Sequence, residues 1–253
     1  MALHTPDYYS IGNPFIELQS VDSTNNYAMA QVHEGMALPG TAYFAHEQFA
    51  GKGQRGKAWI TQPGENIMMS VVLPIQTLSV NEQFVLSACI ALSCFDLLNI
   101  YLPEKIFIKW PNDLYVDDRK TGGILIENII SGDNWKYAIA GIGININQEN
   151  FDERLPNPTS LKKETGQHFD AVSLAKQLCA CIEKRFIQLN KENAAEIINE
   201  YNKLLYKKDK TVRLKKENIV FETVIEKVND RGQLITKDVL ERVFDFGEVE
   251  FQR

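Results

Sequence analysis

The stretch from residue 106 to 147 constrains the fold more than any other part of the chain. Its last segment, Trp135–Asn147, places alanine or isoleucine at every second position from Ala138 to Ile146. Glycine and then asparagine fill the alternate positions from Gly141 to Asn147, and successive side chains of a strand point to opposite faces. One face of this strand therefore belongs to a core. The other face begins bare and ends polar, so either a flat ligand or a covering helix can approach its backbone.

Shorter apolar runs, each bounded by a proline or a polar turn, precede this segment and predict an antiparallel meander. The expected strands and turns are Ile106–Trp110, Leu114–Val116, Asp117–Lys120, Ile124–Ile130 and Ser131–Asn134. Outside the meander, strands are expected at Phe15–Leu18, Thr41–Phe44 and Ile67–Leu73, and helices at Tyr27–Val32, Glu82–Leu102, Ser173–Leu189 and Asn193–Tyr206. A proline-containing connection is expected at Phe151–Leu161. Polar residues interrupt Glu82–Leu102, which favours a helix buried in a soluble core over a membrane span.

The composition changes after Tyr206, where closely spaced short strands replace the helices. These strands are Thr211–Leu214, Ile219–Val228, Gln233–Thr236, Val239–Phe244 and Glu248–Phe251. Their length and spacing predict a small β-barrel. We therefore expect an α+β protein in which residues 1–206 form a mixed or antiparallel sheet flanked by helices, and residues 207–253 form the barrel.

Charge and cysteine usage exclude some classes of function. The net charge is −6, which argues against a nucleic-acid-binding surface, so we expect no specific DNA binding and no membrane binding. The four cysteines lack metal-binding or redox spacing and lie among apolar residues, which predicts reduced, buried thiols. The first residues do not resemble a signal peptide, and a cytoplasmic protein is expected. The cysteines are Cys89, Cys94, Cys179 and Cys181.

The segment Gly51–Trp59 holds three glycines and three cations in nine residues. Such a backbone can fold closely around an anion, although a solvated surface loop has the same composition. Three familiar motifs fail here on context. A dinucleotide fingerprint needs a following helix, whereas Pro63-Gly64 predicts a turn. Ala58 stands where a P-loop has a hydroxyl, and Asp245-Phe246-Gly247 lacks the His-Arg-Asp loop of a kinase.

The polar cluster Asp22–Asn26 comes directly before the expected helix Tyr27–Val32. Serine, threonine and asparagine are preferred at helix N-termini, so a capping role is expected. The same hydroxyls and amides could face a small polar ligand. The two roles are compatible, because donors converge at the start of a helix.

Spaced motifs in a fixed order resemble those of biotin protein ligases. They are Gly51–Trp59, Lys109–Asp113, Asp118–Leu125 and Gly141–Asn145. The resemblance runs from about Asp22 to the C-terminal strands. It implies a catalytic domain of the class II aminoacyl-tRNA-synthetase type, followed by an SH3-like barrel. Some members carry an N-terminal helix-turn-helix, and a ligase-only type is expected here.

The resemblance implies an enzyme that uses ATP, biotin and Mg²⁺ to form biotinyl-5′-AMP. The biotinyl group then passes to a lysine of a biotin carboxyl carrier protein or domain of acetyl-CoA carboxylase or a related carboxylase. Lipoate or octanoate ligases and transferases of the same fold are an alternative, as is an inactive biotin-binding module. A homodimer is left open.

The resemblance also implies roles for individual residues. The implied catalytic residues are Lys120 and Lys52. The implied biotin-binding residues are Ser23, Thr24, Asn25, Gln48, Gly51, Lys52, Gly53, Gln54, Lys120, Gly123 and Gly143. The implied ATP-binding residues are Arg55, Lys57, Trp59, Asn112, Asp113, Lys120 and Asn145. The metal ligands stay unknown. Many relatives have arginine at both Gln54 and Arg55, so the separate roles of these two residues are not assigned.

Overall fold

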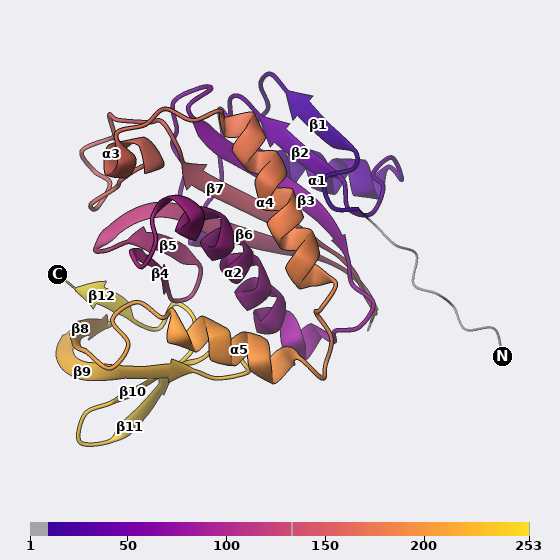
Figure 1. Cartoon of the computed structure of the whole chain (residues 1–253). Coiled ribbons are helices and arrows are strands. Elements are labelled where there is room, and N and C mark those ends of the chain that lie inside the picture. Colours follow the sequence, from indigo (N-terminus) through magenta and orange to yellow (C-terminus); the bar gives the residue numbers. More distant parts are fainter. Residues whose placement is uncertain (1–9, 133, 253) are drawn as a thin grey trace.

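The computed structural model describes residues 10–132 and 134–252, and it contains two sheets (Figure 1). The larger sheet is mixed and has the strand order β1-β2-β3-β7-β6-β5-β4. Its strands are Phe15–Leu18 (β1), Ala42–Ala45 (β2), Asn66–Pro74 (β3), Ile106–Lys109 (β4), Asp113–Val116 (β5), Arg119–Ser131 (β6) and Asn134–Asn145 (β7). Only the β1–β2 pair is parallel, so the expected mixed sheet is confirmed.

Helices α2 (Gln83–Tyr101) and α4 (Ala171–Phe186) cover one face of this sheet and lie side by side (Figure 1). The alternating apolar side chains of β7 are buried beneath them, as the sequence pattern predicts. Helix α2 is long and apolar enough to cross a membrane, but 61% of its most apolar window is buried inside the protein. It is therefore the expected core helix.

Helix α1 (Thr24–His33) covers one end of the opposite face. Ala28 packs there with Tyr43, Val72 and Ile139 in a small apolar cluster. The helix begins three residues before the predicted Tyr27. Its first turn lies against Gly141 of β7 through Asn25, and the polar part of that face beyond Gly141 is left for the site described below.

The four-strand meander β4–β7 is antiparallel throughout, as predicted. The prediction of a turn over Asp117–Lys120 is wrong at its C-terminal end. Only Asp117 and Asp118 separate β5 from β6, because Asp117 takes a left-handed conformation with φ 49° and turns the chain at once. Lys120 consequently lies on a strand, opposite Tyr115.

The second sheet is antiparallel and has the order β11-β10-β9-β8-β12, consistent with an SH3-like domain. Its strands are Thr211–Lys216 (β8), Ile219–Val228 (β9), Leu234–Lys237 (β10), Glu241–Phe244 (β11) and Glu250–Gln252 (β12). Val239 lies in the turn before β11, so that strand is shorter than predicted. Helix α5 (Ala194–Lys203) joins the two sheets, and we propose that the domain boundary falls at 206/207, beyond this helix.

Side-chain bonds attach the C-terminal sheet to the rest of the protein. Trp110, only 5% exposed, donates from its indole nitrogen to the carbonyl of Gly232 at 2.8 Å. On α5, Asn202 exchanges two hydrogen bonds with the backbone of Val228, at 2.8 and 2.7 Å. These buried contacts fix the C-terminal sheet beside the end of β4.

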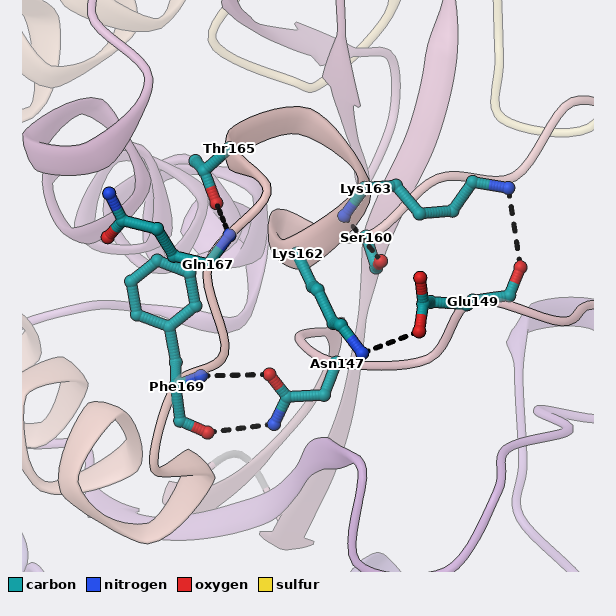
Figure 2. A network of polar contacts seen from close by, with 8 residues as sticks. All are labelled: Asn147, Glu149, Ser160, Lys162, Lys163, Thr165, Gln167 and Phe169. Carbon is teal, nitrogen blue, oxygen red and sulfur yellow. Dashed lines mark hydrogen bonds and ion pairs between the residues drawn. The ribbon is translucent and has the colours of Figure 1, made fainter.

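A short helix, α3 (Leu161–Thr165), lies at the end of the expected connection Phe151–Leu161. The sequence contains a capping residue at each end of this helix. Ser160 caps its start by accepting from the backbone of Lys163, and Gly166 ends it with φ 74°. Figure 2 shows the polar contacts around it.

Asn147 belongs to this network and holds the chain that follows α3. Its side chain exchanges two hydrogen bonds with the backbone of Phe169, at 2.8 and 3.0 Å, as another strand would (Figure 2). The strand predicted to reach Asn147 ends at Asn145, because the Asn66 side chain accepts from the backbone of Ile146 at 2.9 Å.

The four cysteines are free thiols, and three of them are buried. Burial raises the pKa of Cys89 and of Cys179 to about 12. These sulfurs are therefore protonated, poorly nucleophilic core groups, as the sequence analysis expected. Cys181 departs from that expectation, because it is only half-buried.

Candidate active site

A cavity of about 530 Å³ opens on the α1 side of the sheet. Its walls come from the start of α1, the segment Gly51–Trp59, the meander, the connection at 151–158 and the C-terminal sheet. Every residue that the sequence analysis assigned to the site lines this cavity, except Gly51. Gly51 instead joins the two ends of the segment Gly51–Trp59, since its carbonyl accepts from the backbone of Trp59 at 2.8 Å.

Hydroxyl and amide groups gather at the inner end of the cavity. Ser23 occupies the N-cap position of α1, but its side chain caps no backbone group. The Gln48 side-chain oxygen accepts from the backbone nitrogen of Thr24 at 2.7 Å, and the Thr24 hydroxyl lies 3.0 Å from the same oxygen. The predicted capping role is therefore wrong for the Ser23 side chain.

Asn25 stands beside this group with its carboxamide held by protein. Its nitrogen donates to the Leu125 carbonyl at 3.1 Å and to the Glu127 carboxylate at 2.7 Å, and its oxygen lies 2.6 Å from the Ser70 hydroxyl. Asn25 is only 3% exposed. It thus braces the start of α1 against β3 and β6.

The side chains of Asn25 and Trp59 pack on the face of β7 that carries glycine. A Cβ on Gly141 would lie 2.2 Å from the Asn25 side-chain oxygen, and a Cβ on Gly143 would lie 2.5 Å from the Trp59 indole. Either contact is far inside van der Waals distance, so only glycine allows these side chains to approach the sheet so closely. Trp59 therefore forms a wall of the cavity on Gly143.

Lys120 projects into the cavity from β6. Its ammonium group lies 2.6 Å from the Asp113 carboxylate and 5.7 Å from the centre of the Trp59 ring. The backbone of Lys120 is held on both sides, by bonds of 3.0 Å to the Asn157 carbonyl and 2.8 Å from the Thr159 nitrogen. The strand fixes the cation in place, and 31% of its side chain stays open to solvent.

The segment Gly51–Trp59 forms a hairpin around a short 3-10 turn at Gln54–Gly56. Its own backbone bonds include Gly53 N to Lys57 O at 2.6 Å. The Lys52 ammonium reaches the Asn26 side chain, and the Arg55 guanidinium donates to the Gly247 carbonyl at 3.1 Å. Both cations are exposed, so these side-chain contacts hold the hairpin only weakly.

Asn112 and Asn145 line the cavity, but their amide nitrogens are used by the protein. Asn112 donates to the Ile124 carbonyl, and Asn145 donates to the Thr159 carbonyl at 2.9 Å. Their side-chain oxygens can still face a ligand or an ion. Among the described residues, no group of three or more histidine, cysteine or acidic side chains could hold a metal ion.

The C-terminal sheet contributes a wall that sequence reasoning did not assign to the site. Phe246 and Gly247, in the turn between β11 and β12, line the cavity, and so does Phe251. The Phe246 ring meets Trp110 edge-on at 6.3 Å, and the Lys109 ammonium lies 4.7 Å from the centre of the Phe251 ring. None of the spaced motifs that resemble those of biotin protein ligases includes these residues, because their place in the site follows from how the two sheets are joined.

Comparison with known proteins agrees with this geometry. A model of the biotin/lipoate A/B protein ligase family matches residues 17–145, just over half of the chain. The bifunctional ligase/repressor BirA of Bacillus spizizenii is 33% identical over 172 residues, which cover 66% of this chain and 52% of that protein. The biotin–[acetyl-CoA-carboxylase] ligase of Paracoccus denitrificans is 28% identical over 229 residues, covering 87% of this chain and 92% of that protein.

Among solved structures, a biotin protein ligase from Aquifex aeolicus in complex with biotin and ATP has a TM-score of 0.77 and 24% identity. The match covers 94% of this chain and 98% of that one, and it shows the shared fold. The chain spans about half to three fifths of the length of the bifunctional ligase/repressors that it matches. The family match, the fold and the convergence of the spaced motifs on one cavity place the chain in the biotin/lipoate A/B protein ligase family.

Proposed function

We propose that the protein is a biotin protein ligase, which forms biotinyl-AMP from biotin and ATP and transfers biotin to a lysine of a carrier protein. One observation carries the proposal: hydroxyl and amide groups end the same cavity that five cationic side chains line. These cations are Lys52, Arg55, Lys57, Lys109 and Lys120. The name of the Paracoccus relative supports acetyl-CoA carboxylase as the source of the carrier domain.

The inner end of the cavity suits the ureido ring of biotin. That ring offers one carbonyl acceptor and two N–H donors. The Gln48 amide nitrogen can donate to the carbonyl, since the oxygen of the same side chain is engaged by Thr24. The hydroxyl oxygens of Ser23 and Thr24 can accept from the ring nitrogens. A lipoyl or octanoyl chain would leave these groups unpaired in a poorly solvated place, which favours biotin.

In the first step the biotin carboxylate attacks the α-phosphorus of ATP, and pyrophosphate leaves. Negative charge then builds up on the phosphoryl oxygens between nucleophile and leaving group. Lys120 stands on a rigid strand where its cation can contact both the carboxylate and the α-phosphate, and Lys52 adds charge from the hairpin. Positioning and charge stabilisation of this kind need no covalent nucleophile.

In the second step the amine of a carrier lysine attacks the acyl carbonyl of biotinyl-AMP. The carbon–oxygen bond to the phosphate breaks, an amide forms and AMP leaves, while the amine loses a proton. Trp59 and the hairpin lie over the reacting centre and keep bulk water from hydrolysing the mixed anhydride. We place the reaction in the cytoplasm, where ATP and carboxylases meet.

Magnesium fits this cavity as an ion shared with the nucleotide. Asp113 would supply one carboxylate, and the side-chain oxygens of Asn112 and Asn145 would be further oxygen ligands. Mg²⁺ is commonly bound by one or two carboxylates together with substrate phosphates and water, so no larger protein cluster is needed. When bound, it would neutralise charge on the phosphates.

The decisive test is to incubate the protein with ATP and biotin and to look for biotinyl-AMP by mass spectrometry. We expect the adenylate with biotin, and little product when lipoate or octanoate replaces it. Addition of a biotin carboxyl carrier domain should then give a modified lysine. Preferential adenylation of lipoate or octanoate would establish the alternative, and biotin binding without adenylate would identify an inactive binding module.

The hairpin should become protected when the adenylate forms. It is held mainly by its own backbone and by exposed contacts, so we expect it to open in the free protein and to close on an anionic ligand. Limited trypsin digestion should cut first after Lys52, Arg55 or Lys57, and biotin with ATP should slow that cleavage at least about threefold. ATP alone is the control. Resistance of the hairpin without ligand, or equal cleavage rates with and without it, would contradict this expectation.

A further inference from the structure

Ser70 lies on β3 immediately behind the polar end of the cavity. It is fully buried and does not line the cavity, yet its hydroxyl oxygen lies 2.7 Å from the Thr24 hydroxyl and 2.6 Å from the Asn25 side-chain oxygen. A hydroxyl carries a single hydrogen, so it can donate to only one of these two oxygens. Which one it chooses decides how Thr24 faces a ligand.

The orientation of Asn25 settles the choice. Its amide nitrogen faces the Leu125 carbonyl and the Glu127 carboxylate, both of which accept hydrogen bonds. Turning the carboxamide round would bring its oxygen against those two acceptors. The Asn25 oxygen must therefore face Ser70, and because that oxygen needs a donor, the Ser70 hydrogen points to Asn25.

The position of the Thr24 hydroxyl hydrogen follows from that of Ser70. Two hydroxyl oxygens 2.7 Å apart repel unless a hydrogen lies between them, and the hydrogen of Ser70 is already used. Thr24 therefore donates to Ser70. The alternative acceptor, the Gln48 side-chain oxygen, is farther away at 3.0 Å and already accepts from the Thr24 backbone. The side of the Thr24 hydroxyl that faces the cavity is left with lone pairs only.

We propose that Ser70 is a positioning residue that holds the Thr24 hydroxyl as a hydrogen-bond acceptor toward the cavity. Resting on the proposed function, this makes Thr24 the partner of a ureido N–H group, while the Gln48 amide nitrogen donates to the ureido carbonyl. Glu127 thus fixes the orientation of Asn25. Asn25 then fixes the hydrogen of Ser70, and Ser70 fixes the hydrogen of Thr24. This series of hydrogen bonds favours a ligand whose ring nitrogen carries a hydrogen.

Neutron diffraction from the deuterated, ligand-free protein tests the direction itself, whatever the ligand proves to be. We expect deuterium on Thr24 pointing to Ser70, and deuterium on Ser70 pointing to Asn25. Deuterium on Ser70 pointing to Thr24 would overturn the proposal. This measurement does not depend on biotin, so it stands even if the wild-type protein fails to bind biotin and the proposed function falls.

Binding measurements test the consequence for biotin. Ser70→Ala removes the acceptor that holds the Thr24 hydrogen, and we expect biotin affinity to fall about tenfold while kcat at saturating biotin changes by less than about twofold. Ser93→Ala is the matched control, because Ser93 is equally buried and donates only to its own helix, at 2.8 Å. Unchanged affinity in Ser70→Ala, or an equal loss in the control, would refute the proposal.

A double-mutant cycle separates this role from a merely structural one. Thr24→Val removes the hydroxyl through which Ser70 is proposed to act. Adding Ser70→Ala to Thr24→Val should then cost less than about twofold in biotin affinity, because the intermediary is already gone. Additive losses would mean that Ser70 acts through general packing, and they would overturn the assignment.

Discussion

Replacing Lys120 with alanine should slow biotinyl-AMP formation about a hundredfold or more and leave the protein folded. Lys120 projects from β6 into the cavity, and its proposed contact with the biotin carboxylate and the α-phosphate would strengthen as charge develops. Loss of such a contact costs roughly 3–4 kcal/mol of transition-state stabilisation. The ion pair with Asp113 is partly exposed, so its loss should change the free energy of unfolding by about 1 kcal/mol or less.

The measurement is single-turnover adenylate formation, with thermal unfolding recorded for each variant. Lys176→Ala is a suitable control, since Lys176 is an exposed lysine on α4, which covers the opposite face of the sheet. It should react like the wild type. A Lys120→Ala protein that forms biotinyl-AMP at near the wild-type rate would remove Lys120 from the mechanism.

Much of the fold was predictable because its elements have local signatures. The alternation in β7 and the apolar length of α2 specify a strand and a core helix without reference to the rest of the chain. One error lies where a tertiary contact ends an element. β7 stops at Asn145 because Asn66 takes the next backbone donor, and nothing in the pattern near Ile146 announces a partner eighty residues away.

The residues of the site also fall into those that the sequence predicts and those that it does not. Thr24 in the polar cluster and Lys120 in a spaced motif were assigned through the family resemblance and lie on one cavity. Ser70 and Phe246 were missed, because the first is an ordinary serine in an apolar strand and the second lies in a barrel turn. Only the folded chain brings Ser70 behind Thr24 and Phe246 beside Trp110.

The second large effect is expected from glycine substitutions on β7. Gly141→Ala should lower the free energy of unfolding by about 1–3 kcal/mol and weaken biotin binding as well. The added methyl group would lie 2.2 Å from the Asn25 side-chain oxygen, and Asn25 is buried and tied to β3 and β6. It cannot retreat without breaking these bonds. Thermal unfolding and biotin titration measure the two effects.

Gly143→Ala is the informative counterpart. Its methyl group would lie 2.5 Å from the Trp59 indole, but Trp59 ends a hairpin that exposed contacts hold weakly. The indole can move away at little cost to the fold, so stability should change by less than about 1 kcal/mol. Adenylate formation should still fall, because the wall over the reacting centre is displaced. Equal destabilisation by the two substitutions would contradict this distinction.

A double variant isolates the cause of the Gly141→Ala effect. Asn25→Ala removes the side chain that the new methyl group would strike, so Gly141→Ala should cost less than about 1 kcal/mol when it is made in that background. The expected coupling follows from a single close approach between α1 and β7. If Gly141→Ala is as damaging without the Asn25 side chain as with it, strain in the strand itself is responsible, and the glycine is not there to admit Asn25.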